Sequence, residues 1–121
     1  MKKINTRKNV RNEDLYNEIV KSKERNELTP EAVDLFLLMI HKASTKFKYK
    51  NPDDRQDCMS EAISEVIKRW RSFNEIEHTN AFAYYSTVIF NGICKGYNDL
   101  YPKNRITTVP LDIDGYGIYN I

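Results

Sequence analysis

The sequence predicts an all-α protein, a compact bundle of about four helices with a basic N-terminal arm and an irregular C-terminal tail. Apolar residues recur at intervals of three and four through most of residues 12–101. No segment long enough for a dependable strand shows two-residue alternation. Only four glycines and four prolines interrupt the 121 residues, and a hydrophobic content of 40% is enough for one modest core. We therefore expect an arm at 1–11, a helical domain at 12–101 and a tail at 102–121.

The first two helices are expected at residues 13–24 and from residue 29 onward. Asn12 is available as the N-cap of the first, whose apolar side contains Leu15, Ile19 and Val20. Thr29-Pro30-Glu31 supplies the second with a cap, a proline at the first helical position and an acid in the first turn. This helix is expected to end near Phe47, and its apolar residues are Val33, Phe36, Leu37, Ile40 and Ala43.

The third and fourth helices follow two loops, at residues 48–52 and 72–78. The third is expected at about 53–70, with a core-facing stripe of Cys58, Met59, Ala62, Ile63, Val66, Ile67 and Trp70. The fourth is expected from about Thr79-Asn80 to Asn98. Its helical periodicity predicts a core side of Phe82, Ser86, Ile89, Phe90, Ile93 and Tyr97. The opposite side then contains Tyr84, Val88, Asn91 and Lys95, with Tyr85 at an edge.

The net charge of +2 is unevenly distributed along the chain. Residues 1–11 contain five basic residues and no acidic one, whereas residues 12–67 contain twelve acidic and eight basic residues. Residues 68–121 contain six basic and five acidic residues. A protein that binds nucleic acid by charge alone is more often basic throughout, so the sequence argues against a stand-alone nucleic-acid binder.

The sequence contains no recognisable catalytic or metal-binding motif. His41, His78, Cys58 and Cys94 lie at spacings that suit no metal site, and no phosphate-binding glycine loop is present. We interpret the two cysteines as buried, reduced thiols and expect no cofactor, no bound metal and no enzymatic activity. No stretch approaches the roughly 20 apolar residues of a membrane span, so we expect a cytoplasmic protein without a membrane partner.

Acidic residues recur along the third helix, at Asp53, Asp54, Asp57, Glu61 and Glu65. Intervals of about four residues stack side chains along one helix surface and do not converge them on a metal ion. A solvated face is the first interpretation of this strip. A docking face for a basic partner is the second, and metal-dependent catalysis is a distant third.

The fourth helix combines aromatic residues with an almost complete lack of charge. Lys95 is its one charged residue between His78 and Asn98. Aromatic rings stack on unpaired bases, and a nearby lysine can bind phosphate, so the side with Tyr84, Val88, Asn91 and Lys95 suits single-stranded or melted nucleic acid. The alternative is that a further helix or the C-terminal tail covers this side.

Residues 33–111 resemble region 2 of bacterial sigma factors, most closely the late-transcription sigma factors of T-even-related bacteriophages. The resemblance rests on an ordered set of segments: Leu37, Met39 and Ile40, Lys46-Phe47, Asp57-Cys58-Met59-Ser60-Glu61-Ala62, Phe73, Phe82-Ala83-Tyr84-Tyr85-Ser86-Thr87, and Arg105 to Asp112. The paired tryptophans of primary sigma factors are replaced by Val88 and Ile89, so the upstream wedge is missing or weaker.

The resemblance implies two binding surfaces. Asp57, Ser60, Glu61 and Glu65 match the part that docks on the clamp helices of the largest subunit of core RNA polymerase. The promoter-contacting part would include Phe82, Tyr84, Tyr85, Val88, Gly92 and Lys95, and the exposed-side argument given above adds Asn91 to this DNA-binding set. Tyr85 takes the place of the aromatic that stacks on a flipped adenine of the non-template strand. In the phage factors a C-terminal motif binds the sliding clamp, and Leu111–Ile121 has a similar hydrophobic and acidic character. The resemblance therefore implies a sliding clamp or a co-activator as a further partner of the tail. A tail folded back on the domain is the alternative.

The leading hypothesis from the sequence is therefore a minimal sigma-like factor. It would bind core RNA polymerase and direct recognition and melting of an A/T-rich, −10-like late promoter in the cytoplasm of a bacterial host. The alternative is a polymerase-binding adaptor or inhibitor that does not read promoters. A helical metal-dependent nuclease is a weak third hypothesis.

Overall fold

The computed structural model describes residues 9–107, and its elements confirm the all-α prediction. Four α-helices follow one another: α1 (Asn12–Glu24), α2 (Pro30–Ser44), α3 (Pro52–Arg69) and α4 (Ala81–Leu100). Two short 3₁₀ helices, Trp70–Ser72 and Pro102–Asn104, follow α3 and α4. No strand occurs among residues 9–107. Residues 1–8 of the basic arm and residues 108–121 of the C-terminal tail lie outside the described residues.

Polar side chains fix the beginnings of the last three α-helices. Thr29, Asn51 and Asn80 each accept a hydrogen bond from the backbone N–H three residues later. A proline occupies the first position of both α2 and α3, where no N–H is needed. The predicted start of α2 is confirmed, but α2 ends at Ser44 and not near Phe47. The hydroxyls of Ser44 and Thr45 donate to carbonyls of the last turn, which favours termination.

Asn12 does not cap α1, contrary to the prediction. The N-cap of α1 is Arg11, which makes no side-chain capping bond. The Asn12 side chain instead reaches the start of α4, where its amide donates to the Thr79 carbonyl at 3.0 Å and its oxygen accepts from the Phe82 N–H at 3.0 Å. Asn12 and Asn80 therefore share the free N–H groups of α4, and Asn12 ties α1 to α4.

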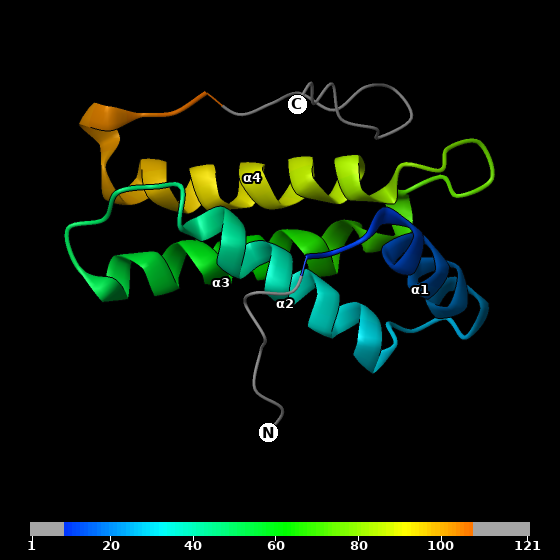
Figure 1. Cartoon of the computed structure of the whole chain (residues 1–121). Helices are drawn as coiled ribbons and strands as arrows, with labels where there is room; N and C mark the ends of the chain where they lie inside the picture. Colours follow the sequence, from blue (N-terminus) through cyan, green and yellow to red (C-terminus); the bar gives the residue numbers. More distant parts are fainter. Residues whose placement is uncertain (1–8, 108–121) are drawn as a thin grey trace.

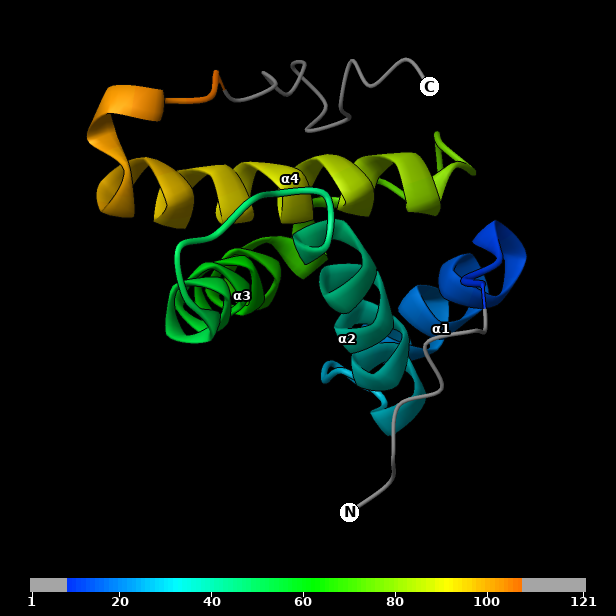
Figure 2. The same ribbon diagram turned by 60° about the vertical axis from the view of Figure 1, so that its left-hand side comes forward.

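The two longest helices, α3 and α4, run side by side and form the main helix pair (Figure 1). They approach closely because small residues face each other across the seam. A Cβ atom at Gly92 would lie 2.7 Å from Cα of Ala62, and one at Gly96 would lie 3.0 Å from Cα of Cys58. Helices α2 and α1 pack against this pair, α2 below α4 and α1 towards the beginning of α4 (Figure 2).

Aromatic rings from α2, from α4 and from the segment after α3 fill the centre of the bundle. The Tyr85 ring lies edge-on to Phe36, with centroids 4.9 Å apart, and its hydroxyl donates to the Trp70 carbonyl at 2.6 Å. Phe73 also packs against Tyr85, with ring centroids 5.7 Å apart. Burial therefore raises the pKa of Tyr85 far above its ordinary value.

The predicted apolar stripe of α3 is wider than the buried face. Cys58, Ala62, Val66 and Trp70 are buried as expected. Ile63 and Ile67, which were assigned to the core, are 38% and 58% exposed. The reason is that α4 covers only the small-residue side of α3, so the two isoleucines fall beyond the contact.

The chain reverses direction after α4. Tyr101 ends the helix, and its hydroxyl accepts from the Lys50 N–H at 2.8 Å and donates to the carboxylate of Asp54. The Asn98 side chain then exchanges two hydrogen bonds with the backbone of Ile106. Residues 105–107 are therefore held beside the last turns of α4. None of the helices in the described part of the chain has the length and apolar character needed to cross a membrane.

Candidate functional site

The predicted exposed side of α4 is largely buried, which corrects the sequence interpretation. Tyr84, Tyr85 and Val88 are 1%, 0% and 2% exposed. The Tyr84 ring packs on Phe73 with centroids 5.5 Å apart and on Tyr85 at 5.0 Å. Burial raises the pKa of the Tyr84 hydroxyl. In this structure these three side chains fill the core and do not present rings to a nucleic-acid strand.

Gly92 is also buried, and it faces the backbone of Ala62 across the α3–α4 contact. Asn91 is half-buried and Lys95 is exposed. These two residues and Phe82, which is half-buried, are the members of the predicted DNA-binding set with side-chain surface outside the core. The structure does not gather the seven predicted residues on one surface.

The glycines explain why the predicted exposed side of α4 is largely buried, although Ile89 and Ile93 of the predicted core side are buried as expected. The prediction from helical periodicity placed large apolar residues on the core side. It did not consider that Gly92 and Gly96 allow another helix to pack closely against their side of α4. A pair of glycines four residues apart favours close helix packing, and the facing pair Cys58 and Ala62 has the same spacing on α3. The spacing of Gly92 and Gly96 is visible in the sequence. Placing these two glycines at the contact with α3 would have predicted that Val88 and Tyr85 are buried.

A groove of about 500 Å³ opens between α2, α4 and the segment before α1. Side chains that were assigned to the core line it, among them the half-buried Phe82, Ser86 and Phe90. The complete lining is Asn9, Val10, Met39, Lys42, Ala43, Lys46, Phe82, Ser86, Ile89 and Phe90. Its surface is mainly apolar, and its charged groups are the ammonium groups of Lys42 and Lys46. No pattern in the sequence predicts this groove.

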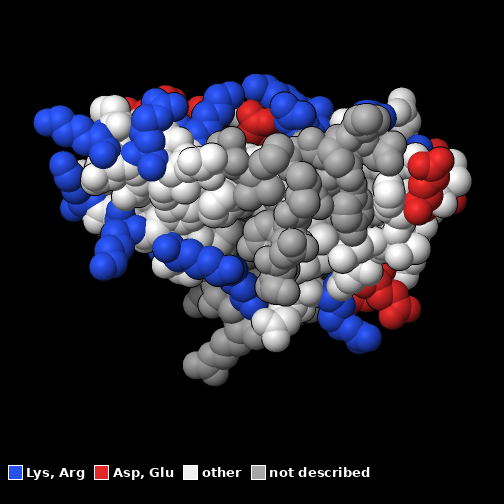
Figure 3. Space-filling view, turned by 90° about the horizontal axis from the view of Figure 1, so that it is seen from above, with Lys and Arg blue, Asp and Glu red and all other residues white. Residues whose placement is uncertain are grey.

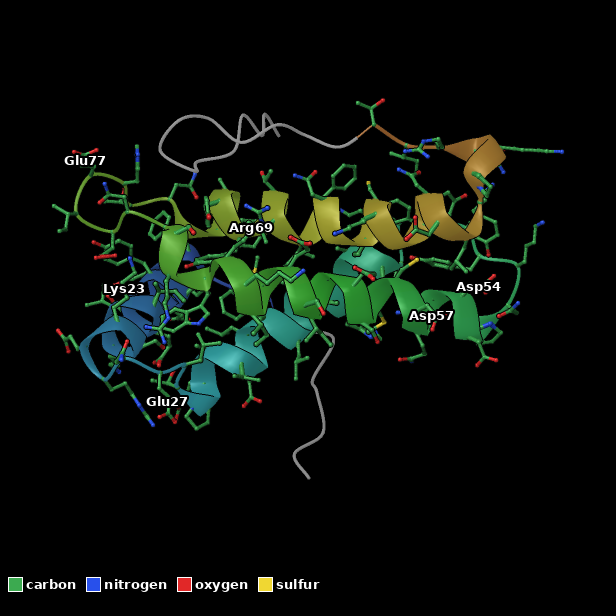
Figure 4. All side chains as sticks on the ribbon, turned by 180° about the vertical axis from the view of Figure 1, so that it is seen from behind. Lys23, Glu27, Asp54, Asp57, Arg69 and Glu77 are labelled. Atoms are coloured by element: carbon green, nitrogen blue, oxygen red, sulfur yellow. The ribbon has the colours of Figure 1, made fainter. Side chains whose placement is uncertain are left out.

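The predicted acidic strip on α3 is divided between two surfaces. Asp57 and Ser60 are exposed, whereas Glu61 is half-buried and Glu65 is buried. Figure 4 shows Asp54 and Asp57 near the beginning of α3 and Arg69 near its end, beside α4. The prediction of an outward strip therefore holds for Asp57 and Ser60 and is wrong for Glu65.

Glu65 is the centre of a charged contact across the α3–α4 seam. Its carboxylate accepts from Nε of Arg69 at 3.0 Å and from Nζ of Lys95 at 3.4 Å. Burial alone would raise the pKa of Glu65, but the hydrogen bonds and positive charges of Arg69 and Lys95 outweigh it and hold the pKa below its ordinary value. Glu65 was predicted to bind polymerase and Lys95 to bind DNA. In the structure the two side chains form a contact between α3 and α4, so both have a structural role.

We define the outer face of α3 as Asp57, Ser60, Ile63, Ser64 and Ile67. All five are exposed and recur at helical spacing. The face therefore has an acidic end, small hydroxyl side chains and two exposed isoleucines. Acidic and apolar groups side by side on one helix suit a helical partner that offers basic and apolar groups.

Basic residues gather at the end of the molecule where α4 ends, as seen from above (Figure 3). Lys46, Lys48 and Lys50 lie in the α2–α3 loop, and Lys103 and Arg105 follow α4. No acidic residue occurs in 42–52 or in 100–107. The hydrogen bond between Tyr101 and Lys50 holds the two segments together, so they form one basic surface beside the groove.

The cysteines are buried, as predicted. Burial raises the pKa of both Cys58 and Cys94 to about 11, and nearby acids of α3 add to the effect at Cys58. Both are therefore protonated thiols at neutral pH. Within residues 9–107, no group of three or more histidine, cysteine, aspartate or glutamate side chains is placed to hold a metal ion.

Comparisons with protein families, curated proteins and solved structures found no match to this chain.

Proposed function

We propose that the protein is a minimal sigma-like initiation factor that binds core RNA polymerase and directs it to an A/T-rich, −10-like promoter. Two kinds of observation support the proposal: the ordered resemblance of residues 33–111 to sigma region 2, and the outer face of α3. The outer face carries the argument, because it presents Asp57, Ile63 and Ile67 on the helix that the resemblance assigns to polymerase docking. The partner on this proposal is the clamp-helix region of the largest polymerase subunit.

The structure changes which residues would bind promoter DNA. Since Tyr84, Tyr85, Val88 and Gly92 are buried, contact with the melted non-template strand would fall to residues outside the core. Phe82 is the member of the set that opens onto the groove between α2 and α4. An aromatic edge beside the ammonium groups of Lys42 and Lys46 provides stacking and phosphate-binding groups. The phage origin, the late promoter class and the bacterial cytoplasm belong to the same proposal.

Polymerase binding and promoter melting test the proposal separately. In pull-down with bacterial core RNA polymerase at low salt, we expect the wild type to bind and Asp57→Lys to bind weakly, because it reverses the charge of the acidic end. Phe82→Ala should keep polymerase binding but reduce transcription from an A/T-rich −10 template. Absence of polymerase binding by the wild type at low salt would refute the proposal.

The burial of Tyr84, Tyr85, Val88 and Gly92 favours a second candidate, a polymerase-binding adaptor or inhibitor without promoter reading. This candidate needs the outer face of α3 and no nucleic-acid site. It predicts that Asp57→Lys abolishes binding and that the wild type does not support transcription from the −10 template. Addition of the wild type to polymerase loaded with a host sigma factor would then inhibit transcription.

A further inference from the structure

The groove between α2 and α4 combines an apolar floor with basic groups at its edge. Phe82 and Phe90 contribute aromatic surface from α4, and Val10 closes one side. Lys46 is exposed at the edge, and Lys42 donates to Oδ1 of Asn9 at 2.9 Å. A groove of about 500 Å³ with this character suits an extended peptide in which apolar and acidic residues alternate.

The chain itself contains such a segment, Leu111-Asp112-Ile113-Asp114. Residues 108–121 include these two aspartates and no basic residue. In an extended segment successive side chains point to opposite sides. Leu111 and Ile113 can therefore face an apolar floor while both aspartates face its basic edge.

The described residues place this segment within reach of the groove. The two hydrogen bonds between Asn98 and Ile106 hold the returning chain beside the last turns of α4 (orange in Figure 1). Phe90 lies eight residues before Asn98, or about 12 Å back along the helix axis. The five residues from Ile106 to Leu111 can span up to about 17 Å when extended. Eight residues also turn Phe90 about 80° around the helix axis from Asn98, which lengthens the path. Leu111 therefore reaches the Phe90 side of the groove when residues 106–111 are nearly fully extended.

We propose that Leu111–Asp114 binds in the groove between α2 and α4 of the same molecule. Leu111 and Ile113 lie on the apolar floor, and Asp112 and Asp114 face Lys42 and Lys46. The tail then covers the exposed edges of Phe82 and Phe90 and competes with any other ligand of the groove. This inference stands independently of the proposed function, because it needs neither polymerase nor DNA.

Cross-linking within the full chain tests the placement. Ser86→Cys puts a thiol in the groove, and Gly115→Cys puts one next to the segment without altering it. Cys58 and Cys94 are buried thiols with a pKa of about 11 and should not compete for a short bismaleimide. The matched control combines Gly115→Cys with Ser64→Cys on the outer face of α3. We expect the groove pair to form the intramolecular cross-link about tenfold faster, because binding raises the effective concentration of the tail thiol there.

Charge reversal provides the second measurement. Asp112→Lys with Asp114→Lys should slow the cross-link of the groove pair several-fold, and adding Lys42→Glu with Lys46→Glu should restore it. Circular dichroism checks that all variants keep the helical fold. Equal rates for the groove and control pairs would overturn the proposal, as would a lack of response to charge reversal. A cross-link that forms between molecules and rises with concentration would also overturn it, since a second copy would then occupy the groove.

Discussion

At the scale of single residues, Glu65 is the clearest case of a charge that stabilises the fold. Its carboxylate is buried while Arg69 and Lys95 remain about half-exposed. Because its folded-state pKa is lowered, its contribution to stability is fully present above the unfolded glutamate pKa of about 4.3. The contribution is lost as the pH falls through the lower folded-state pKa.

Glu65→Gln should therefore lower the free energy of unfolding by about 1 kcal/mol at pH 7, a small value because both partners face solvent. The difference in the free energy of unfolding between this variant and the wild type should become smaller in acid, because Glu65 in the wild type is then protonated. Urea unfolding at pH 7 and pH 3 measures both effects, and Glu24→Gln on the exposed side of α1 is the control. A difference that is the same at both pH values would contradict an ionic role for Glu65.

The two cysteines provide a second prediction at this scale. Since burial raises the pKa of both thiols to about 11, neither is a reactive thiolate at pH 7.5. Iodoacetamide should leave the folded protein unmodified and should alkylate both cysteines in urea, as mass spectrometry would show. Rapid alkylation of either cysteine without urea would mean that the α3–α4 seam opens easily.

At the scale of helices, the close contact between α3 and α4 depends on Gly92. A Cβ atom there would meet the backbone of Ala62 at 2.7 Å, and backbone atoms cannot move aside as a flexible side chain can. Alanine would favour the helix by about 1 kcal/mol over glycine. The forced separation of two packed helices costs more, typically about 1–3 kcal/mol and sometimes above that range.

We therefore expect Gly92→Ala to destabilise the protein by about 1–2 kcal/mol, the opposite of its effect in an isolated helix. Thermal and urea unfolding provide the measurement. Asp99→Ala, at an exposed position of the same helix, should be neutral or slightly stabilising. A Gly92→Ala variant more stable than the wild type would show that the helices do not approach as closely as described.

Asn12 provides the second prediction at this scale, because it caps a helix to which it does not belong. Asn12→Ala should cost about 1 kcal/mol, the usual value of a lost N-cap. The loss should be local, with faster hydrogen exchange of the Phe82 amide. Asn17→Ala, on the exposed side of α1, should leave that amide unchanged. Equal exchange at Phe82 in both variants would exclude the capping role.

Helix positions were predictable from the sequence, whereas helix orientation was only partly so. Thr29-Pro30, Asn51-Pro52 and Asn80 mark helix beginnings by local hydrogen bonding, which requires no knowledge of the partner helix. The face that a helix buries depends on what packs against it. Phe82 and Phe90 have the same hydrophobic character as Tyr85 but line a groove, and Ile67 has core character but lies exposed.

The candidate site was also predictable only where the local sequence decides the position of a side chain. Asp57 was placed correctly because the acidic spacing alone puts it on one helix surface, and Ser60, which was assigned from the resemblance, is exposed beside it. Glu65 has the same spacing, yet it is buried because α4 packs against it at Gly92, where an added Cβ would lie 3.2 Å from Cγ of Glu65. The groove between α2 and α4 has no local signal, since it forms where segments far apart in the sequence meet.

At the scale of the whole molecule, the near-neutral net charge is the sum of acidic and basic groups that lie on different surfaces. Acidic and apolar groups lie on the outer face of α3, and basic groups lie at the end of α4 beside the groove. A protein with this arrangement can bind two partners of opposite charge on separate surfaces. This separation is what the proposed function requires of a factor that bridges a polymerase and DNA.

The proposed function depends on binding of core RNA polymerase to the outer face of α3. The most direct test is fluorescence anisotropy of labelled full-length protein titrated with bacterial core polymerase. We predict saturable binding by the wild type and at least about a tenfold loss of affinity for the double variant Asp57→Lys, Ile67→Lys. Glu24→Lys, an equivalent charge reversal on α1, should bind like the wild type. Unchanged affinity of the double variant, or no binding by the wild type, would contradict the account.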